Sequence, residues 1–142
     1  MKPEKQIAAL ISQVRSSINR FLIKELKENG IEGLAPSHGG ILFHLFNNEQ
    51  VTMKQLATAV RRDKSTVTAL VDKLVAKGYA HKTISPDDQR TFYVHLTERG
   101  KSFQPVFEKV SERLISRVWK GIDPADQKEV IRILHQIESN FR

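Results

Sequence analysis

Small hydroxyl groups and basic side chains gather at the beginning of one expected helix, which starts near Asp63. The residues in its first turns are Lys64, Ser65, Thr66 and Thr68. Hydroxyl groups donate and accept hydrogen bonds, ammonium groups attract anions, and small side chains let a helix sit deep in a groove. The helix dipole adds positive charge at the same end. This pattern therefore predicts contacts with phosphate groups and base edges of DNA.

A hairpin is expected directly after this helix, with strands at 79–84 and 92–96 joined by the loop "SPDDQR". Arg90 at its tip could enter a minor groove, where the negative potential is enhanced. Asp88 would repel phosphate, so we expect it to hold an arginine side chain, Arg90 or another, or to cap the turn. The alternative is an ordinary solvated turn, which would explain Pro86 and Asp87 but not the basic tip.

The expected DNA-binding surface combines the helix beginning near Asp63, its flanks and the hairpin. Its residues are Lys54, Arg61, Arg62, Lys64, Ser65, Thr66, Thr68, Ala69, Lys73, Lys82, Gln89 and Arg90. Lys54, Arg61 and Arg62 flank the helix, and we expect them to contact phosphates rather than bases.

The charge distribution agrees with a polyanionic partner. The chain of 142 residues has a net charge of +7, and residues 53–101 hold ten Lys/Arg against five Asp/Glu, a net of +5. A basic balance alone is a weak signal, because it also suits a solvated surface. The chain has no cysteine and no apolar run long enough to span a bilayer. We therefore expect a cytoplasmic protein without disulfides or membrane contact.

The elements that position this surface are mainly helical. Apolar residues at three- and four-residue steps predict helices at 4–28, 98–120 and 123–141 and two short helices before residue 78. Thr52 and Gln55 are expected to form a capping box, and the expected N-caps are Asp63, Thr97 and Asp123. The expected inner stripe of the helix that begins near Asp63 is Val67, Leu70, Val71, Leu74 and Val75. Pro36 is expected in the first turn of a further short helix, and Pro105 should kink the helix at 98–120 or mark its beginning. Two short helices followed by a hairpin form a winged helix-turn-helix, here about 36–97 within a single domain 1–142. The fold class is mainly α with a small β-wing.

The segments "LATAVRRDKSTVTALVDKLVAKGY" and "DDQRTFYVHLTERGK" resemble the MarR family of bacterial transcription regulators. The resemblance covers the whole chain. It implies a homodimer built from the first helix and the last two, and sequence-specific binding to a pseudo-palindromic double-stranded DNA operator. It also implies repression and release by a small-molecule effector. Ala35 departs from the family, which often has a threonine cap there.

The resemblance also implies a ligand pocket between the dimer helices and the DNA-binding part, which Phe21, His38 and Phe43 could line. Metal-sensing members use clustered histidines, whereas the histidines here are scattered at positions 38, 44, 81, 95 and 135. We therefore expect no metal and no cofactor.

Two other classes of protein compete with a DNA-binding regulator. An enzyme is not expected, because the sequence has no phosphate-binding glycine loop, nucleophile elbow or metal-ligand spacing. A winged-helix module that binds proteins is the alternative. It would need an apolar exposed face on the helix beginning near Asp63, and that face is polar and basic.

Overall fold

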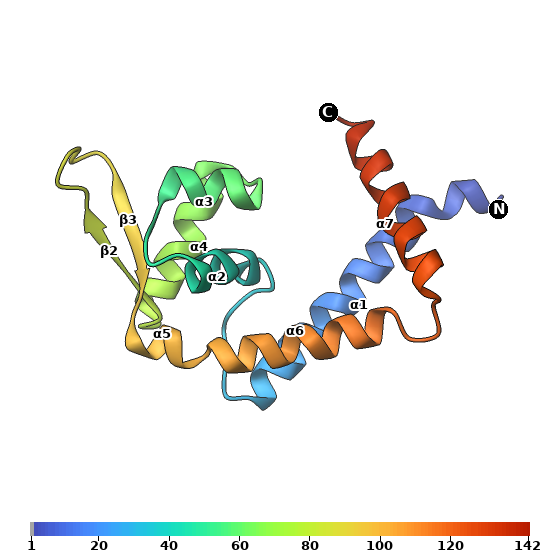
Figure 1. Ribbon diagram of the computed structural model, residues 1–142, viewed down its shortest axis with the longest axis horizontal. Helices are drawn as coiled ribbons and strands as arrows, with labels where there is room; N and C mark the ends of the chain where they lie inside the picture. Colours follow the sequence, from blue (N-terminus) through green and yellow to red (C-terminus); the bar gives the residue numbers. More distant parts are fainter. Residues whose placement is uncertain (1) are drawn as a thin grey trace. The chain divides into compact units, whose positions relative to one another are not determined.

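Seven α-helices and a three-stranded sheet make up the computed structural model, which describes residues 2–142 (Figure 1). The elements are η1 (Pro3–Gln6), α1 (Ile7–Glu28), α2 (His38–Asn47), β1 (Val51–Thr52), α3 (Met53–Val60), α4 (Lys64–Ala76), β2 (Ala80–Ile84), β3 (Phe92–Leu96), α5 (Glu98–Ser102), α6 (Gln104–Val118) and α7 (Pro124–Ser139). The first of two compact units ends at Val110, and the second comprises Ser111–Arg142.

The helix-turn-helix consists of α3 and α4, and both helices begin at the expected capping residues. Thr52 and Gln55 form a reciprocal capping box at α3, with N···O distances of 2.9 and 3.0 Å. Asp63 caps α4 by accepting a hydrogen bond from the Thr66 backbone at 2.7 Å. Arg61, which has φ = 54°, makes the left-handed turn between the two helices.

The core of the first unit lies beneath these helices. Its most deeply buried side chains come from α2, α3, α4 and β3, and they are Ile41, Leu42, Leu56, Val67, Val71, Leu74 and Val94. The apolar stripe expected for α4 is confirmed at Val67, Val71 and Leu74, whereas Val75 is exposed. The opposite face of α4 remains at the surface, so the burial of this stripe fixes which side chains α4 presents to a partner.

The sheet is antiparallel and has the order β1-β3-β2. The hairpin places Ala80 opposite Leu96 and Ile84 opposite Phe92, in agreement with the expected strands. The strand β1 was not expected, and it pairs Val51 with Val94 immediately before α3. The central strand β3 thus connects the hairpin to the beginning of the helix-turn-helix.

The expected position of Pro36 was wrong, because α2 begins at His38. Residues 35–37 form a turn in which the backbone N–H of His38 donates to the carbonyl of Ala35 at 2.9 Å. The His38 ring folds back and its Nδ1 accepts a hydrogen bond from the backbone N–H of Ala35 at 2.9 Å. This contact stabilises the turn immediately before α2.

The helix expected at 98–120 is two helices, α5 and α6, interrupted at Phe103. Pro105 has no N–H with which to continue the hydrogen-bond pattern, so a new helix begins beside it. Thr97 caps α5 as expected, accepting from the backbone N–H of Gly100 at 3.1 Å. Asp123 occupies the N-cap position of α7, although its side chain makes no capping hydrogen bond.

Gly100 lies at the closest backbone approach between α5 and the hairpin. A Cβ atom at this position would lie 2.1 Å from the carbonyl oxygen of Tyr79 and 3.0 Å from a methyl group of Leu96. The same carbonyl accepts a hydrogen bond from the Thr97 backbone at 3.0 Å, and the Thr97 hydroxyl donates to the carbonyl of Gly78 at 2.6 Å. The absence of a side chain at Gly100 allows both bonds.

Two helices carry apolar side chains that this chain alone leaves exposed. On α1 these are Ile7, Leu10, Ile11 and Val14, which are 44–55% exposed. On α7 they are Val130, Ile131, Ile133 and Leu134, which are 40–45% exposed. Among the described residues, no helix combines the length and apolar character needed to cross a membrane.

Candidate nucleic-acid interface

The N-terminal end of α4 is organised around the carboxylate of Asp63. Its Oδ1 accepts hydrogen bonds from the Thr66 backbone at 2.7 Å and from the Ser65 hydroxyl at 2.9 Å. These hydrogen bonds, first of all the one from the Thr66 backbone, lower the pKa of Asp63, and the nearby charge of Arg62 adds to the effect. Asp63 therefore stays ionised at neutral pH and fixes the geometry of the first turn.

The hydroxyl groups on this turn have defined roles. Ser65 donates its proton to Asp63, so its lone pairs remain available to a donor such as the amino group of adenine or cytosine. Thr68 donates to the carbonyl of Lys64 at 2.8 Å, a common arrangement inside helices. With its hydroxyl engaged in this way, Thr68 has its methyl group left for contacts with a base.

The other residues expected around α4 occupy its exposed surroundings. Lys54, Arg62, Lys64, Ala69 and Lys73 are exposed, and Thr66 is half-buried. Arg61 is also exposed, and it makes an interaction within the chain. The structure therefore places these cations at the surface of α3, the turn and α4.

At the hairpin tip, Asp88 holds the turn through the backbone. Its carboxylate accepts hydrogen bonds from the Arg90 backbone at 3.0 Å and from the Thr91 hydroxyl at 3.3 Å. Of the two roles expected for Asp88, the structure thus supports capping of the turn rather than pairing with an arginine side chain. The side chains of Gln89 and Arg90 are exposed beyond this cap.

Lys82 is placed differently from the other cations. It lies on β2, and its ammonium group forms an ion pair with Asp72 on α4. This pair connects the hairpin to the helix, so contact of Lys82 with DNA would require its ammonium group to be shared with Asp72. No local sequence pattern marks Asp72 as the partner of Lys82, because the two residues meet only when the hairpin packs against α4.

The three residues expected to line a ligand pocket lie in different environments. His38 is 2% exposed, whereas Phe43 on the same helix is 62% exposed and Phe21 is half-buried. Burial lowers the pKa of His38, whereas its contacts with the backbone of Ala35 and Leu70 act in the opposite direction. His38 therefore belongs to the core, and α2 turns Phe43 away from it.

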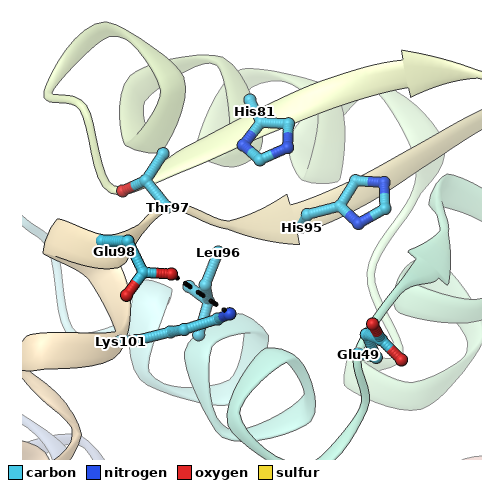
Figure 2. Close-up of a pocket in the computed structure, with 7 residues that line it drawn as sticks. All are labelled: Glu49, His81, His95, Leu96, Thr97, Glu98 and Lys101. Carbon is cyan, nitrogen blue, oxygen red and sulfur yellow. Dashed lines mark ion pairs between the residues drawn. The ribbon is translucent and has the colours of Figure 1, made fainter.

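Two of the five histidines meet on the hairpin. His81 and His95 are register partners on β2 and β3, and their rings stack with centroids 5.0 Å apart. Figure 2 shows them beside a surface cavity of about 390 Å³ that is also lined by Glu49, Thr97 and the ion pair between Glu98 and Lys101. The hairpin register would have revealed this pair in the sequence. Among residues 2–142, no group of three or more His, Cys, Asp or Glu could hold a metal ion.

Comparisons with known proteins agree with this geometry. The model of the MarR family matches residues 32–91, which include the helix-turn-helix and part of the hairpin. Over these residues the chain is similar to the MarR family. A relative in Bacillus subtilis, the uncharacterised HTH-type transcriptional regulator YkoM, is 25% identical over 118 residues, covering 83% of this chain and 75% of its own.

Solved structures share the fold of this chain. A MarR transcriptional regulator from Methanosarcina mazei superimposes with a TM-score of 0.78 at 22% identity, covering 96% of both chains. Overoxidised AbfR bound to DNA superimposes with a TM-score of 0.77 at 22% identity, covering 98% of this chain and 94% of its own. The predicted winged helix-turn-helix is thus confirmed, and the relatives are transcriptional regulators rather than enzymes.

Proposed function

We propose that this protein is a member of the MarR family and acts as a dimeric, sequence-specific DNA-binding repressor. The observation that carries the proposal is the N-terminal end of α4, where ordered hydroxyl groups lie among exposed cations. In the proposed complex, α4 enters the major groove with Ser65, Thr66 and Thr68 toward base edges. The wing places Arg90 in the adjacent minor groove.

The remaining cations contact phosphates in this proposal. Lys54, Arg61, Arg62, Lys64 and Lys73 surround the residues that would read bases, which is the usual division between positioning and reading contacts. A DNA-bound structure of AbfR, which shares this fold, supports DNA as the partner. Lys82 would act mainly by holding the wing against α4 through Asp72.

A homodimer is proposed because α1 and α7 each leave an apolar face exposed. Two copies of α4 about 34 Å apart would read two half-sites one helical turn apart, which gives a pseudo-palindromic operator. Light scattering should report twice the chain mass of 16.2 kDa. A stable monomer at micromolar concentration would contradict this part of the proposal.

Repression follows if the operator overlaps the promoter, because the bound dimer would then exclude the polymerase. Release by a small-molecule effector is also proposed from the family resemblance. The separate positions of His38 and Phe43 do not favour a pocket that contains both, so an effector screen should include ligands of varied size, shape and charge.

The test is fluorescence anisotropy of the pure protein with DNA from immediately upstream of its own gene, compared with scrambled DNA. About eight phosphate contacts per dimer would give a log–log slope of affinity against salt of about −7. Tight, salt-dependent binding that prefers the upstream DNA supports a sequence-specific regulator. Absence of binding to either DNA at low salt would refute the proposal and favour the protein-binding alternative.

A further inference from the structure

Another surface cavity lies at the C-terminal end of α4. It has a volume of about 400 Å³ and is lined by Gly30, Glu32, Lys77, Tyr79 and Arg99. These residues come from the loop after α1, the end of α4, the beginning of the hairpin and α5. All of them belong to the first compact unit. The volume falls in the range of cavities that bind small molecules.

The aromatic ring of Tyr79 orients one of the two cations. The Arg99 guanidinium lies over this ring, 4.9 Å from its centroid, and Tyr79 itself is 5% exposed. The buried ring is fixed by an edge-to-face contact with Phe103 at 5.2 Å. A stacked guanidinium keeps its N–H groups directed outward in the plane, where they can donate two parallel hydrogen bonds to a carboxylate or phosphate.

Lys77 supplies the second cation from the end of α4. Its ammonium group lies against Gly33, where an added Cβ atom would be 2.6 Å from Nζ. Within residues 2–142, neither the ammonium group of Lys77 nor the guanidinium of Arg99 takes part in an ion pair or a hydrogen bond. The two cations line one cavity and repel each other, and a bound anion would offset that repulsion.

This cavity is separate from the proposed DNA surface. α4 has 13 residues, so its two ends lie about 20 Å apart. Figure 1 shows α4 running from its junction with α3 toward α5, where Arg99 is located. Phosphates bound at Lys64 would therefore not reach Lys77 or Arg99.

We propose that Lys77 and Arg99 form a binding site for a small anion that carries a carboxylate or phosphate group. The anion accepts hydrogen bonds from the Arg99 guanidinium and the Lys77 ammonium group. Glu32, in the same cavity, opposes the anion and limits its affinity. A bound anion would link the end of α4 to α5. Control of DNA binding through this link would rest on the proposed function. The anion site itself does not depend on that function.

The test is a titration of the full-length protein with inorganic phosphate in the absence of DNA, followed by residue-resolved NMR. We expect saturable shifts at the backbone amides of Gly33, Gly78 and Arg99. Arg99→Gln and Lys77→Gln should each weaken this binding about tenfold, as expected for loss of a hydrogen bond between charged groups. Lys109→Gln removes an exposed charge on α6 outside the cavity and should leave it unchanged.

Two further variants separate an anion site from a merely structural cluster. Glu32→Gln should tighten phosphate binding about two- to fivefold, because it removes the opposing charge. Arg99→Lys keeps the charge but loses the planar fork, so its binding should be weaker than that of the wild type. The proposal is overturned if the shifts map to residues 61–66 alone, or if folded Arg99→Gln and Lys77→Gln proteins bind phosphate as the wild type does. Because no DNA is present, a failure of DNA binding would leave this result interpretable.

Discussion

Gly100→Ala should destabilise the protein more than the same substitution at any other glycine of the winged helix. The new Cβ atom would lie 2.1 Å from the Tyr79 carbonyl oxygen, more than 1 Å inside an ordinary contact. Because the obstacle is backbone, relief requires α5 to move away from the hairpin. This movement would strain the hydrogen bonds from Thr97 to the carbonyls of Tyr79 and Gly78.

The expected magnitude combines two effects. Overpacking of a well-packed site costs about 1–3 kcal/mol, and each weakened hydrogen bond costs about 1 kcal/mol. Part of the overpacking is relieved when the bonds break, so we expect a loss of about 2–4 kcal/mol in the free energy of unfolding. Alanine has a higher helix propensity than glycine, by up to about 1 kcal/mol, and this gain offsets only part of the loss.

Urea denaturation followed by circular dichroism measures this change, at one fixed protein concentration because dimerisation would add to stability. Gly39→Ala is the matched control. Gly39 lies in α2 with ordinary helical backbone, and an added Cβ atom there would meet nothing within 4 Å. That variant should be as stable as the wild type or slightly more stable. A Gly100→Ala protein within about 0.5 kcal/mol of the wild type would refute the reasoning.

The other predictions concern DNA binding and pH. Arg90→Ala should weaken operator binding by about 1–3 kcal/mol per contact in anisotropy measurements, whereas Lys128→Ala on α7 should leave it unchanged. Equal losses of affinity in the two variants would mean that Arg90 contributes only its positive charge and no specific contact. Ser65→Ala should lower affinity for operator DNA more than for random DNA, and equal losses on both would assign Ser65 to phosphate contact. Asp63 has a lowered pKa when folded, so its stabilising effect is present above its ordinary value of 3.8 and is lost as pH falls below it. The free energy of unfolding of Asp63→Asn should therefore fall less steeply between about pH 5 and 3 than that of the wild type. Equal pH dependence in the two proteins would mean that the Asp63 carboxylate does not stabilise α4. Burial also lowers the pKa of His38, so the unfolded chain binds this proton more readily than the folded chain, and the free energy of unfolding should fall as pH drops below 6.5. His38→Gln should reduce this pH dependence, measured as urea midpoints at about pH 7.5 and 5.5. An unchanged pH dependence in that variant would show that His38 is not its cause.

The sequence predicted those features that depend on neighbouring residues. The caps at Thr52, Asp63 and Thr97 are short-range patterns, and the structure confirms all three. The buried stripe of α4 followed from helical spacing, and the strands of the wing followed from alternation. The residues of the candidate DNA surface lie on these local elements, and their contacts with DNA stay a prediction.

Features that depend on distant residues were not predicted. The strand β1 forms only because Val51 pairs with Val94 on the distant strand β3. The ion pair of Lys82 with Asp72 depends on how the wing packs against α4. Lys77 and Arg99 are 22 positions apart in the sequence, and only the packing of Tyr79 brings them to one cavity. In each case tertiary contacts determine what local spacing leaves open.

The central strand β3 has a consequence for how such a protein can change its DNA target. Pairing of β3 with β1 and β2 fixes the wing relative to α3, while the sheet ends at Ile84 and Phe92. The segment between those residues lies beyond the sheet and is held by its own turn contacts. Insertions or substitutions there can alter how far the tip reaches along DNA without moving α4. Recognition by the wing and recognition by the helix can thus evolve separately on one rigid frame.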